Sequence, residues 1–234
     1  MAPALLDTVS FMTTLKRITM TVAVAAIFII SARGQGFQNL DFESAQNLPG
    51  NPANGELVPT ANALPGWTAY DGFLPGALAL SDIYYVSNTL GRAQNPELES
   101  GSLALSGNFS VGLYGISAIS QTGMVPDNAE SLQFEAHITD NALSVALGAQ
   151  SLSFSALSEG PGYTVYGANI PAGMDGQTEA LTFSLEFSSA GTLLDNIEFS
   201  PTSVPEPSAC ALIGVGAVLF GFCYRRKMDV TRRL

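Results

Sequence analysis

The sequence predicts an all-β protein: a β-sandwich preceded by an N-terminal signal helix and followed by a C-terminal transmembrane helix. Apolar and polar residues alternate in Leu132–Ala136 and Leu181–Phe187, the pattern of a strand with one buried face. Short runs of this kind are separated by Gly, Pro, Asn and Asp, without helical heptads. About 170 residues lie between the two targeting ends, which is enough for one domain with its own core.

The N-terminal element, residues 1–34, has the layout of a secretory signal peptide. A basic pair, Lys16–Arg17, precedes a thirteen-residue apolar run, Ile18–Ile30, and small residues follow. A start at Met12 would give a signal peptide of more usual length. The alternative is a retained membrane helix, which is less favoured because thirteen residues are too few to span a bilayer comfortably.

The strands of the domain, residues 35–203, are expected where apolar and small polar residues alternate between turn residues. They are Phe37–Phe42, Ala77–Leu80, Ile83–Val86, Ser102–Leu105, Ser110–Gly115, Ala118–Thr122, Glu130–Ile138, Leu143–Leu147, Gln150–Phe154, Gly162–Asn169, Glu179–Ser188 and Thr192–Phe199. Leu48–Pro65 contains four prolines and is expected to be a long loop.

Three short pieces of this domain carry a resemblance: Asn39–Glu43, Pro65–Thr68 and Leu194–Phe199. Their arrangement resembles galactose-binding-like jelly rolls, which include several carbohydrate-binding modules. The resemblance implies a jelly-roll sandwich in which the first and last strands pair. It also implies a calcium site at Asp41, Glu43 and Asp195, since carboxylates are hard oxygen ligands. The alternative is that these acids face solvent at strand ends.

Binding of a sugar requires exposed aromatic rings, and several lie in the first half of the domain. Trp67, Tyr70, Tyr84 and Tyr85 are the candidate ligand-binding residues; Phe73 and Tyr114 are further rings. The alternative is that these aromatic residues belong to the core, as most do in a domain of this size.

The charge of the domain is one-sided. Seventeen acidic residues between Gln35 and Val204 are accompanied by a single base, Arg92, so the net charge is about −16. Such a surface repels phosphates, which excludes nucleic acid and anionic lipid as partners. Both cysteines, Cys210 and Cys223, lie beyond the domain, so no disulfide stabilises it.

The residues indicate no enzyme. The one histidine, His137, lies in an alternating run on the side opposite Phe134 and is expected to face solvent. No Gly-x-Ser-x-Gly elbow accompanies it, and zinc is disfavoured because the domain has one histidine and no cysteine. A carboxylate pair for glycoside hydrolysis stays open, since seventeen acids are available and no spacing singles out a pair.

The C-terminal end is built from three consecutive parts. Val204, Pro205, Glu206 and Pro207 form an extended segment, because proline removes backbone donors and disfavours helix in the residue before it. An uncharged apolar helix follows over residues 208–224, and its basic stop is Arg225, Arg226 and Lys227. A cytoplasmic tail, residues 228–234, ends the chain.

This order of motif, span and basic stop over residues 204–227 resembles the PEP-CTERM sorting signal of Gram-negative bacteria. The resemblance implies an exosortase as processing partner, a transient anchor in the inner membrane, and delivery to the cell surface or extracellular matrix. We therefore expect a non-enzymatic surface or biofilm-matrix protein associated with extracellular polysaccharide. A secreted hydrolase acting on matrix polysaccharide and a structural matrix protein without a specific ligand are the alternatives.

Overall fold

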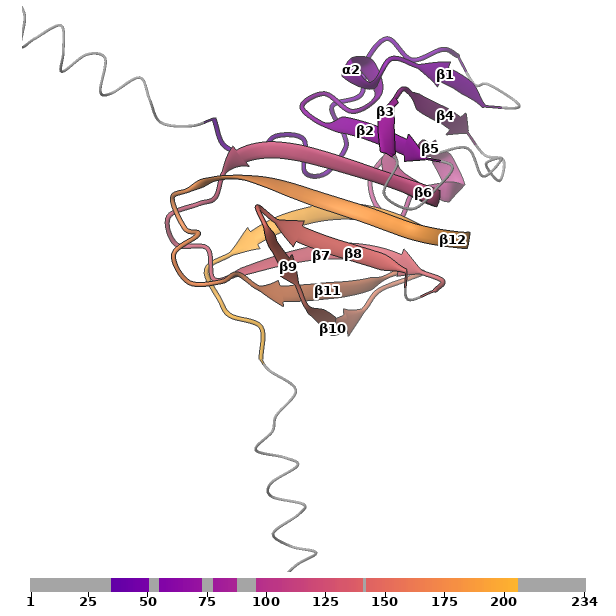
Figure 1. The fold of residues 1–234 in the computed structure, drawn as a ribbon. Coiled ribbons are helices and arrows are strands. Elements are labelled where there is room, and N and C mark those ends of the chain that lie inside the picture. Colours follow the sequence, from indigo (N-terminus) through magenta and orange to yellow (C-terminus); the bar gives the residue numbers. More distant parts are fainter. Residues whose placement is uncertain (1–34, 51–54, 73–77, 88–95, 141, 206–234) are drawn as a thin grey trace, which may run out of the picture.

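The computed structural model describes residues 35–50, 55–72, 78–87, 96–140 and 142–205 (Figure 1). Within these ranges twelve strands form one mixed sheet, so the predicted all-β class is confirmed. Two short helices, α2 (Thr60–Ala63) and the 3-10 helix η1 (Gly101–Leu103), accompany the strands there. The strands are β1 (Glu56–Val58), β2 (Thr68–Gly72), β3 (Leu78–Ser81), β4 (Ile83–Ser87), β5 (Glu97–Ser100), β6 (Phe109–Met124), β7 (Ser131–Ile138), β8 (Leu143–Leu147), β9 (Gln150–Leu152), β10 (Phe154–Glu159), β11 (Thr164–Asn169) and β12 (Thr178–Ser200).

Two long strands, β6 and β12, organise the sheet. They pair antiparallel from Thr178 opposite Met124 to Leu194 opposite Val111. The main path is β1-β4-β5-β6-β12-β7-β11-β10, with β2 and β3 attached to β6, and β8 and β9 attached to β12. The neighbours β4 and β5 run parallel, which makes the sheet mixed.

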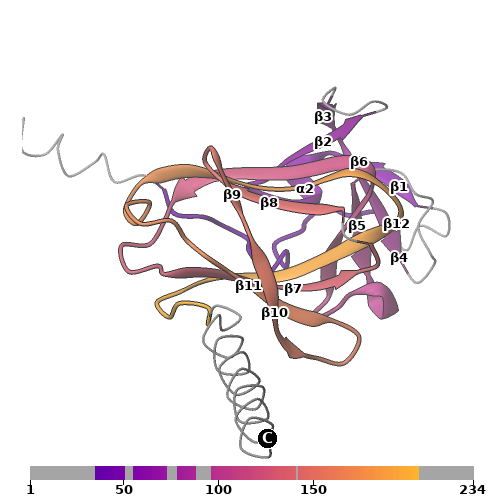
Figure 2. The same cartoon turned by 60° about the horizontal axis from the view of Figure 1, so that its bottom comes forward.

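Both long strands bend at the same place. Gly115 of β6 lies opposite Ser188 of β12, and the register shifts on both sides of this pair. Gly115 and the nearby Gly191 adopt φ values of 58° and 78°, which glycine tolerates because it has no Cβ. The bend folds the sheet over, so that β8 and the first half of β12 face β7 and β11 (Figures 1 and 2). The sequence predicted a sandwich; the structure has two layers that are halves of one continuous sheet.

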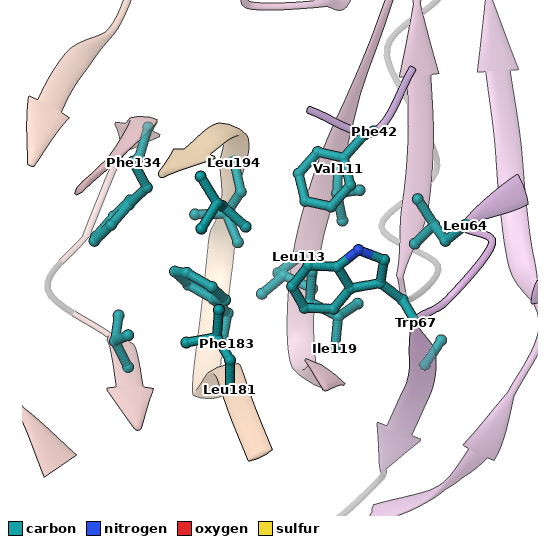
Figure 3. Packing of buried hydrophobic residues seen from close by; sticks show 14 of the residues in the cluster. Phe42, Leu64, Trp67, Val111, Leu113, Ile119, Phe134, Leu181, Phe183 and Leu194 are labelled. Carbon is teal, nitrogen blue, oxygen red and sulfur yellow. The ribbon is translucent and has the colours of Figure 1, made fainter. Parts of the chain in front are cut away.

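The space between the two halves is filled by one hydrophobic core. Phe134 of β7 lies at its centre and contacts Phe183 of β12 edge-on, with ring centroids 5.3 Å apart. The rings of Phe154 and Tyr166 pack against Phe134 at 5.4 and 5.7 Å. Figure 3 shows Phe134 and Phe183 in the same cluster as Trp67. The alternation predicted in β7 and β12 is confirmed for the side chains that the structure describes. The buried ones are Leu132, Phe134 and Ala136 of β7 and Leu181, Phe183 and Leu185 of β12.

The segment Phe37–Phe42 is not the predicted first strand. Asn39 and Phe42 adopt positive φ angles of 48° and 56°, so the chain turns here instead of continuing extended. A single backbone bond, from the Ile197 N–H to the Leu40 carbonyl at 2.9 Å, joins the segment to β12. The first and last strands therefore do not pair as the jelly-roll resemblance implied.

Burial of Phe42 explains the turn. Its side chain is fully buried and lies against the Trp67 indole at 5.6 Å, while the indole N–H donates to the Asn39 carbonyl at 3.0 Å. The energy of burying Phe42 outweighs the local preference of the alternating run for a strand.

Other predicted boundaries differ where strands merge or where a loop is ordered. Ser110–Gly115 and Ala118–Thr122 are parts of β6, and the last two predicted strands are parts of β12. The expected loop Leu48–Pro65 contains β1 and α2, and the expected strand Ser102–Leu105 overlaps η1.

The predicted signal peptide (residues 1–34), the membrane helix (208–224), the basic stop and the tail (228–234) lie outside the described residues. In the described ranges, no helix is long and apolar enough to span a membrane.

Replacing Phe134 by alanine is expected to lower the free energy of unfolding by about 3–5 kcal/mol, because it leaves a cavity between the two layers. Chemical denaturation of the purified protein measures this loss. Leu80→Ala is the matched control: this side chain is 77% exposed, and its loss is expected to change stability by about 0.5 kcal/mol or less. A Phe134→Ala protein as stable as the control would contradict the assignment of the core.

Candidate functional site

The outer face of one half of the sheet carries a row of polar side chains. Leu98, Val111, Leu194 and Phe134 of β5, β6, β12 and β7 point into the core. Because side chains alternate along a strand, the residues next to these four point away from the core, to the other face of the sheet. These neighbours lie side by side in the strand register and form what we call the acidic row: Glu99, Ser110, Asp195 and Glu135.

Asp195 is the most enclosed carboxylate of the acidic row, with 1% of its surface exposed. Its Oδ2 accepts hydrogen bonds from the Ser110 hydroxyl at 2.7 Å and the Ser106 N–H at 3.2 Å, and its Oδ1 accepts from the Asn196 N–H at 2.7 Å. Burial raises the pKa of Asp195 to about 6, against the effect of these donors, and the facing Glu135 carboxylate adds to the rise.

Glu135 lies directly across from Asp195 on β7. Within the described residues, its Oε2 atom is buried and has no hydrogen-bond partner. The negative charge of Glu135 raises the pKa of the Tyr163 hydroxyl, which is hydrogen bonded to this carboxylate. The carboxylates of Asp195 and Glu135 therefore lie side by side, next to the Tyr163 hydroxyl. The residues that the structure describes include no lysine or arginine that could neutralise them.

At the other end of the acidic row, Glu99 is 2% exposed. Its Oε1 accepts a hydrogen bond of 2.5 Å from the Tyr114 hydroxyl. Burial raises the pKa of Glu99, and the bond from Tyr114 only partly opposes this rise. Gly112 provides the space, since a Cβ there would lie 2.7 Å from both Glu99 Oε1 and the Tyr114 ring.

Next to Glu135 the surface opens into a pocket of about 700 Å³, which we call the polar pocket. It lies between the N-terminal segment, β7, β11 and the bulge of β12 between Asp195 and Glu198. Asn196 occupies this bulge with a φ of 43°, a conformation that asparagine tolerates better than most residues. The lining combines three carboxylates, three amides and apolar groups: Asp41, Glu135, Glu198, Asn39, Gln133, Asn196, Phe37, Leu40, Phe134, Val165 and Ile197.

The structure separates the three residues of the predicted calcium site. Asp41 is exposed and lines the polar pocket, whereas Asp195 lies in the buried row. Glu43 accepts hydrogen bonds from Asn108 and Phe109 instead. Slight burial raises the pKa of Glu43, but these donors lower it below its ordinary value. In the described part of the chain, no three His, Cys, Asp or Glu residues are grouped to hold a metal ion.

Calcium binding therefore stays a prediction without a described ligand set. Calorimetric titration of the protein with calcium chloride tests this prediction. Binding should release or absorb heat and raise the melting temperature. The absence of both changes would contradict the prediction.

The four predicted ligand-binding aromatic residues do not form one surface. Trp67 and Tyr85 are 5% and 9% exposed and belong to the core, so they cannot present sugar platforms. Tyr70 and Tyr84 are half-buried on β2 and β4, which are not neighbours in the sheet. The core alternative holds for Trp67 and Tyr85, because their neighbours Phe42 and Phe109 cover the rings.

Sequence reasoning placed His137 correctly but did not find the acidic row. His137 is exposed, with its Nδ1 3.1 Å from the Gly162 carbonyl. Glu135 and Glu99 alternate with buried apolar residues in their strands. In the sequence, this pattern is typical of a strand whose polar side chains face solvent. Only the register of β5, β6, β12 and β7 brings their carboxylates together.

Comparison with known proteins identifies the C-terminal end. Residues 203–227 match the family model of the PEP-CTERM protein-sorting motif. This motif implies processing by an exosortase, secretion, and localisation at the cell surface of a Gram-negative bacterium. Val204 and Pro205 lie within the described residues, whereas Glu206, Pro207, Arg225, Arg226 and Lys227 lie outside them.

No curated protein and no solved structure matches the chain. The resemblance of the domain to galactose-binding-like modules therefore has no support from known proteins.

The acidic row makes stability depend on pH. Because Asp195 and Glu99 have raised pKa values in the folded protein, the folded state binds more protons, and stability increases as the pH falls from 7 to about 4.5. Below that, Glu43 acts in the opposite direction, since the stabilisation from its lowered pKa is lost as it becomes protonated. For Asp195 alone, whose pKa is raised from 3.8 to about 6, we expect a gain on the order of 2 kcal/mol between pH 7 and 4.5.

Unfolding measured at a series of pH values checks this expectation. Asp195→Asn should flatten the rise, whereas Glu186→Gln, which removes an exposed carboxylate of β12, should retain it. A wild-type protein whose stability falls steadily from pH 7 to 4.5 would overturn the account.

Proposed function

We propose that the sorted domain is a non-enzymatic cell-surface or matrix protein that binds extracellular polysaccharide in the polar pocket. The observation that carries this proposal is the lining of the pocket, which combines amide and carboxylate groups with apolar surface. Sugar hydroxyls both donate and accept hydrogen bonds, which suits amides and carboxylates. The C–H faces of sugar rings suit apolar surface such as Phe37 and Val165.

The charge of the domain narrows the class of polysaccharide. The described residues contain all seventeen acids of the domain, while every lysine and arginine of the chain lies outside them. Anionic polysaccharides and nucleic acids would meet only negative charge at the polar pocket, which disfavours both. Neutral glycans, and those with amino groups, are the ligands that this electrostatic field permits or attracts.

A second candidate function rests on the pair Glu135 and Asp195. Paired carboxylates with one raised pKa are what a glycoside hydrolase requires, and the pKa of Asp195 is about 6. Against this, Asp195 is 1% exposed and its oxygens accept three hydrogen bonds from the protein. These bonds favour a structural role for Asp195, so binding without hydrolysis is the better-supported function.

The binding proposal is tested with the full chain on an array of neutral, amino-substituted and anionic glycans. Binding to neutral or amino-substituted glycans is expected, and the double variant Gln133→Ala/Glu198→Ala should weaken it about 10-fold. These residues are cross-strand neighbours in the polar pocket, and each lost hydrogen bond costs about 0.5–1.5 kcal/mol.

The matched control is Gln150→Ala/Glu186→Ala, which removes one exposed glutamine and one exposed glutamate elsewhere. It should bind as the wild type does. Absence of binding to every glycan would favour a structural matrix protein. Release of oligosaccharides that Glu135→Gln abolishes would favour the hydrolase.

A further inference from the structure

The chain that follows β12 stays attached to the domain. Beyond Ser200 it passes the start of β7, where the Ser131 hydroxyl donates to the Thr202 carbonyl at 2.7 Å. The Ser203 N–H then donates to the Glu130 carboxylate at 3.1 Å. The sorting motif, which begins at residue 203, therefore starts on the folded domain.

Asn169, the last residue of β11, holds Val204 through both of its backbone polar groups. The Val204 N–H donates to Asn169 Oδ1 at 2.6 Å, and Asn169 Nδ2 donates to the Val204 carbonyl at 3.1 Å. This two-bond arrangement copies the pairing of neighbouring β-strands, with a side-chain amide in place of a backbone. Another protein cannot use the same groups of Val204 while Asn169 occupies them.

The Val204 side chain is also accommodated by the domain. Val204 is 7% exposed, while Thr202, Ser203 and Pro205 around it are exposed. It lies over Gly167 of β11, where a Cβ would come within 2.7 Å of both Val204 Cγ2 and Leu157 Cδ1. The missing side chain of Gly167 thus makes room for the valine. We call Leu157, Gly167 and Asn169 the valine site.

Attachment at the valine site limits how far the domain can move from the apolar segment. Between Val204 and Ala209, the first apolar residue of the predicted membrane helix 208–224, there are only four residues, which span about 14 Å at most. If the chain detached from the domain as far back as the end of β12, the four residues Pro201–Val204 would join this connection. The domain and the apolar segment could then lie up to about 28 Å apart. An enzyme in the membrane would then have more room around the motif.

We propose that the valine site binds Val204, the second residue of the matched sorting motif, and that Val204 must leave the site before the processing enzyme acts. The ligand of the site is an extended Val-Pro segment of the chain itself. The folded domain thereby protects the motif on its N-terminal side, and Asn169 is a positioning residue for processing. The inference rests on the sorting motif and is independent of any glycan binding.

Processing of the full chain in a Gram-negative host with an exosortase tests the consequence. In a pulse-chase experiment, Asn169→Ala, which removes both bonds to Val204, should be cleaved several-fold faster than the wild type. Gly167→Ala should act in the same direction, because its methyl group displaces Val204 and leaves Asn169 intact.

Asn128→Ala and Gly50→Ala are the controls, since the Asn128 side chain makes no described hydrogen bond and a Cβ at Gly50 meets nothing within 4 Å. Wild-type or slower cleavage of both Asn169→Ala and Gly167→Ala would overturn the proposal.

A second measurement detects the attachment without the processing enzyme. In a host lacking exosortase and a background with Cys210→Ala and Cys223→Ala, a membrane-impermeant maleimide labels single cysteines placed in the segment. Val204→Cys should react several-fold more slowly than the exposed Ser203→Cys, and Asn169→Ala should remove this difference. If Val204→Cys and Ser203→Cys were labelled at equal rates in the chain that retains Asn169, Val204 would not be bound in the valine site. An unchanged melting temperature in Asn169→Ala separates release of the segment from unfolding of the domain.

Discussion

The pairing of β6 with β12 is the interaction on which the rest of the structure depends. Each strand contributes to both layers, because both bend where Gly115 lies opposite Ser188. One half of the pair supports β2 and β8, and the other half supports β5 and β7. The core, the acidic row and the bulge beside the polar pocket all follow from this one register. A slip of one residue would exchange the buried and exposed faces of both halves.

The described residues must stabilise their carboxylates without lysine or arginine. Hydrogen bonds from backbone N–H groups and hydroxyls take the place of ion pairs, as at Glu43 and Asp195. Where such donors do not offset the effect of burial, the pKa of the carboxyl group rises, as at Glu99 and Asp195. Hydrogen bonds from backbone N–H groups act in the same way at the C-terminal end. There the Glu130 carboxylate and the Asn169 amide accept them from Ser203 and Val204 at the start of the sorting motif.

Sequence reasoning succeeded where local pattern and burial agree. In β7 and β12 the alternation named the buried residues correctly, because each strand has one face against the core. It was wrong for Phe37–Phe42, where the alternation is that of a strand but burial of Phe42 beside Trp67 turns the chain. Trp67 and Tyr85 were candidates for a binding surface for a related reason: an aromatic residue near a loop has the same sequence signature whether it is covered or exposed.

The amino-acid sequence by itself determined the β class, the one-sided charge and the sorting motif, since each depends on composition or on neighbouring residues. Tertiary structure decided which strands are neighbours, and therefore that Glu135 faces Asp195 and that Val204 rests over Gly167. The physical reason is that strand period fixes the face of a side chain, whereas contacts between distant strands depend on pairing that no local pattern encodes.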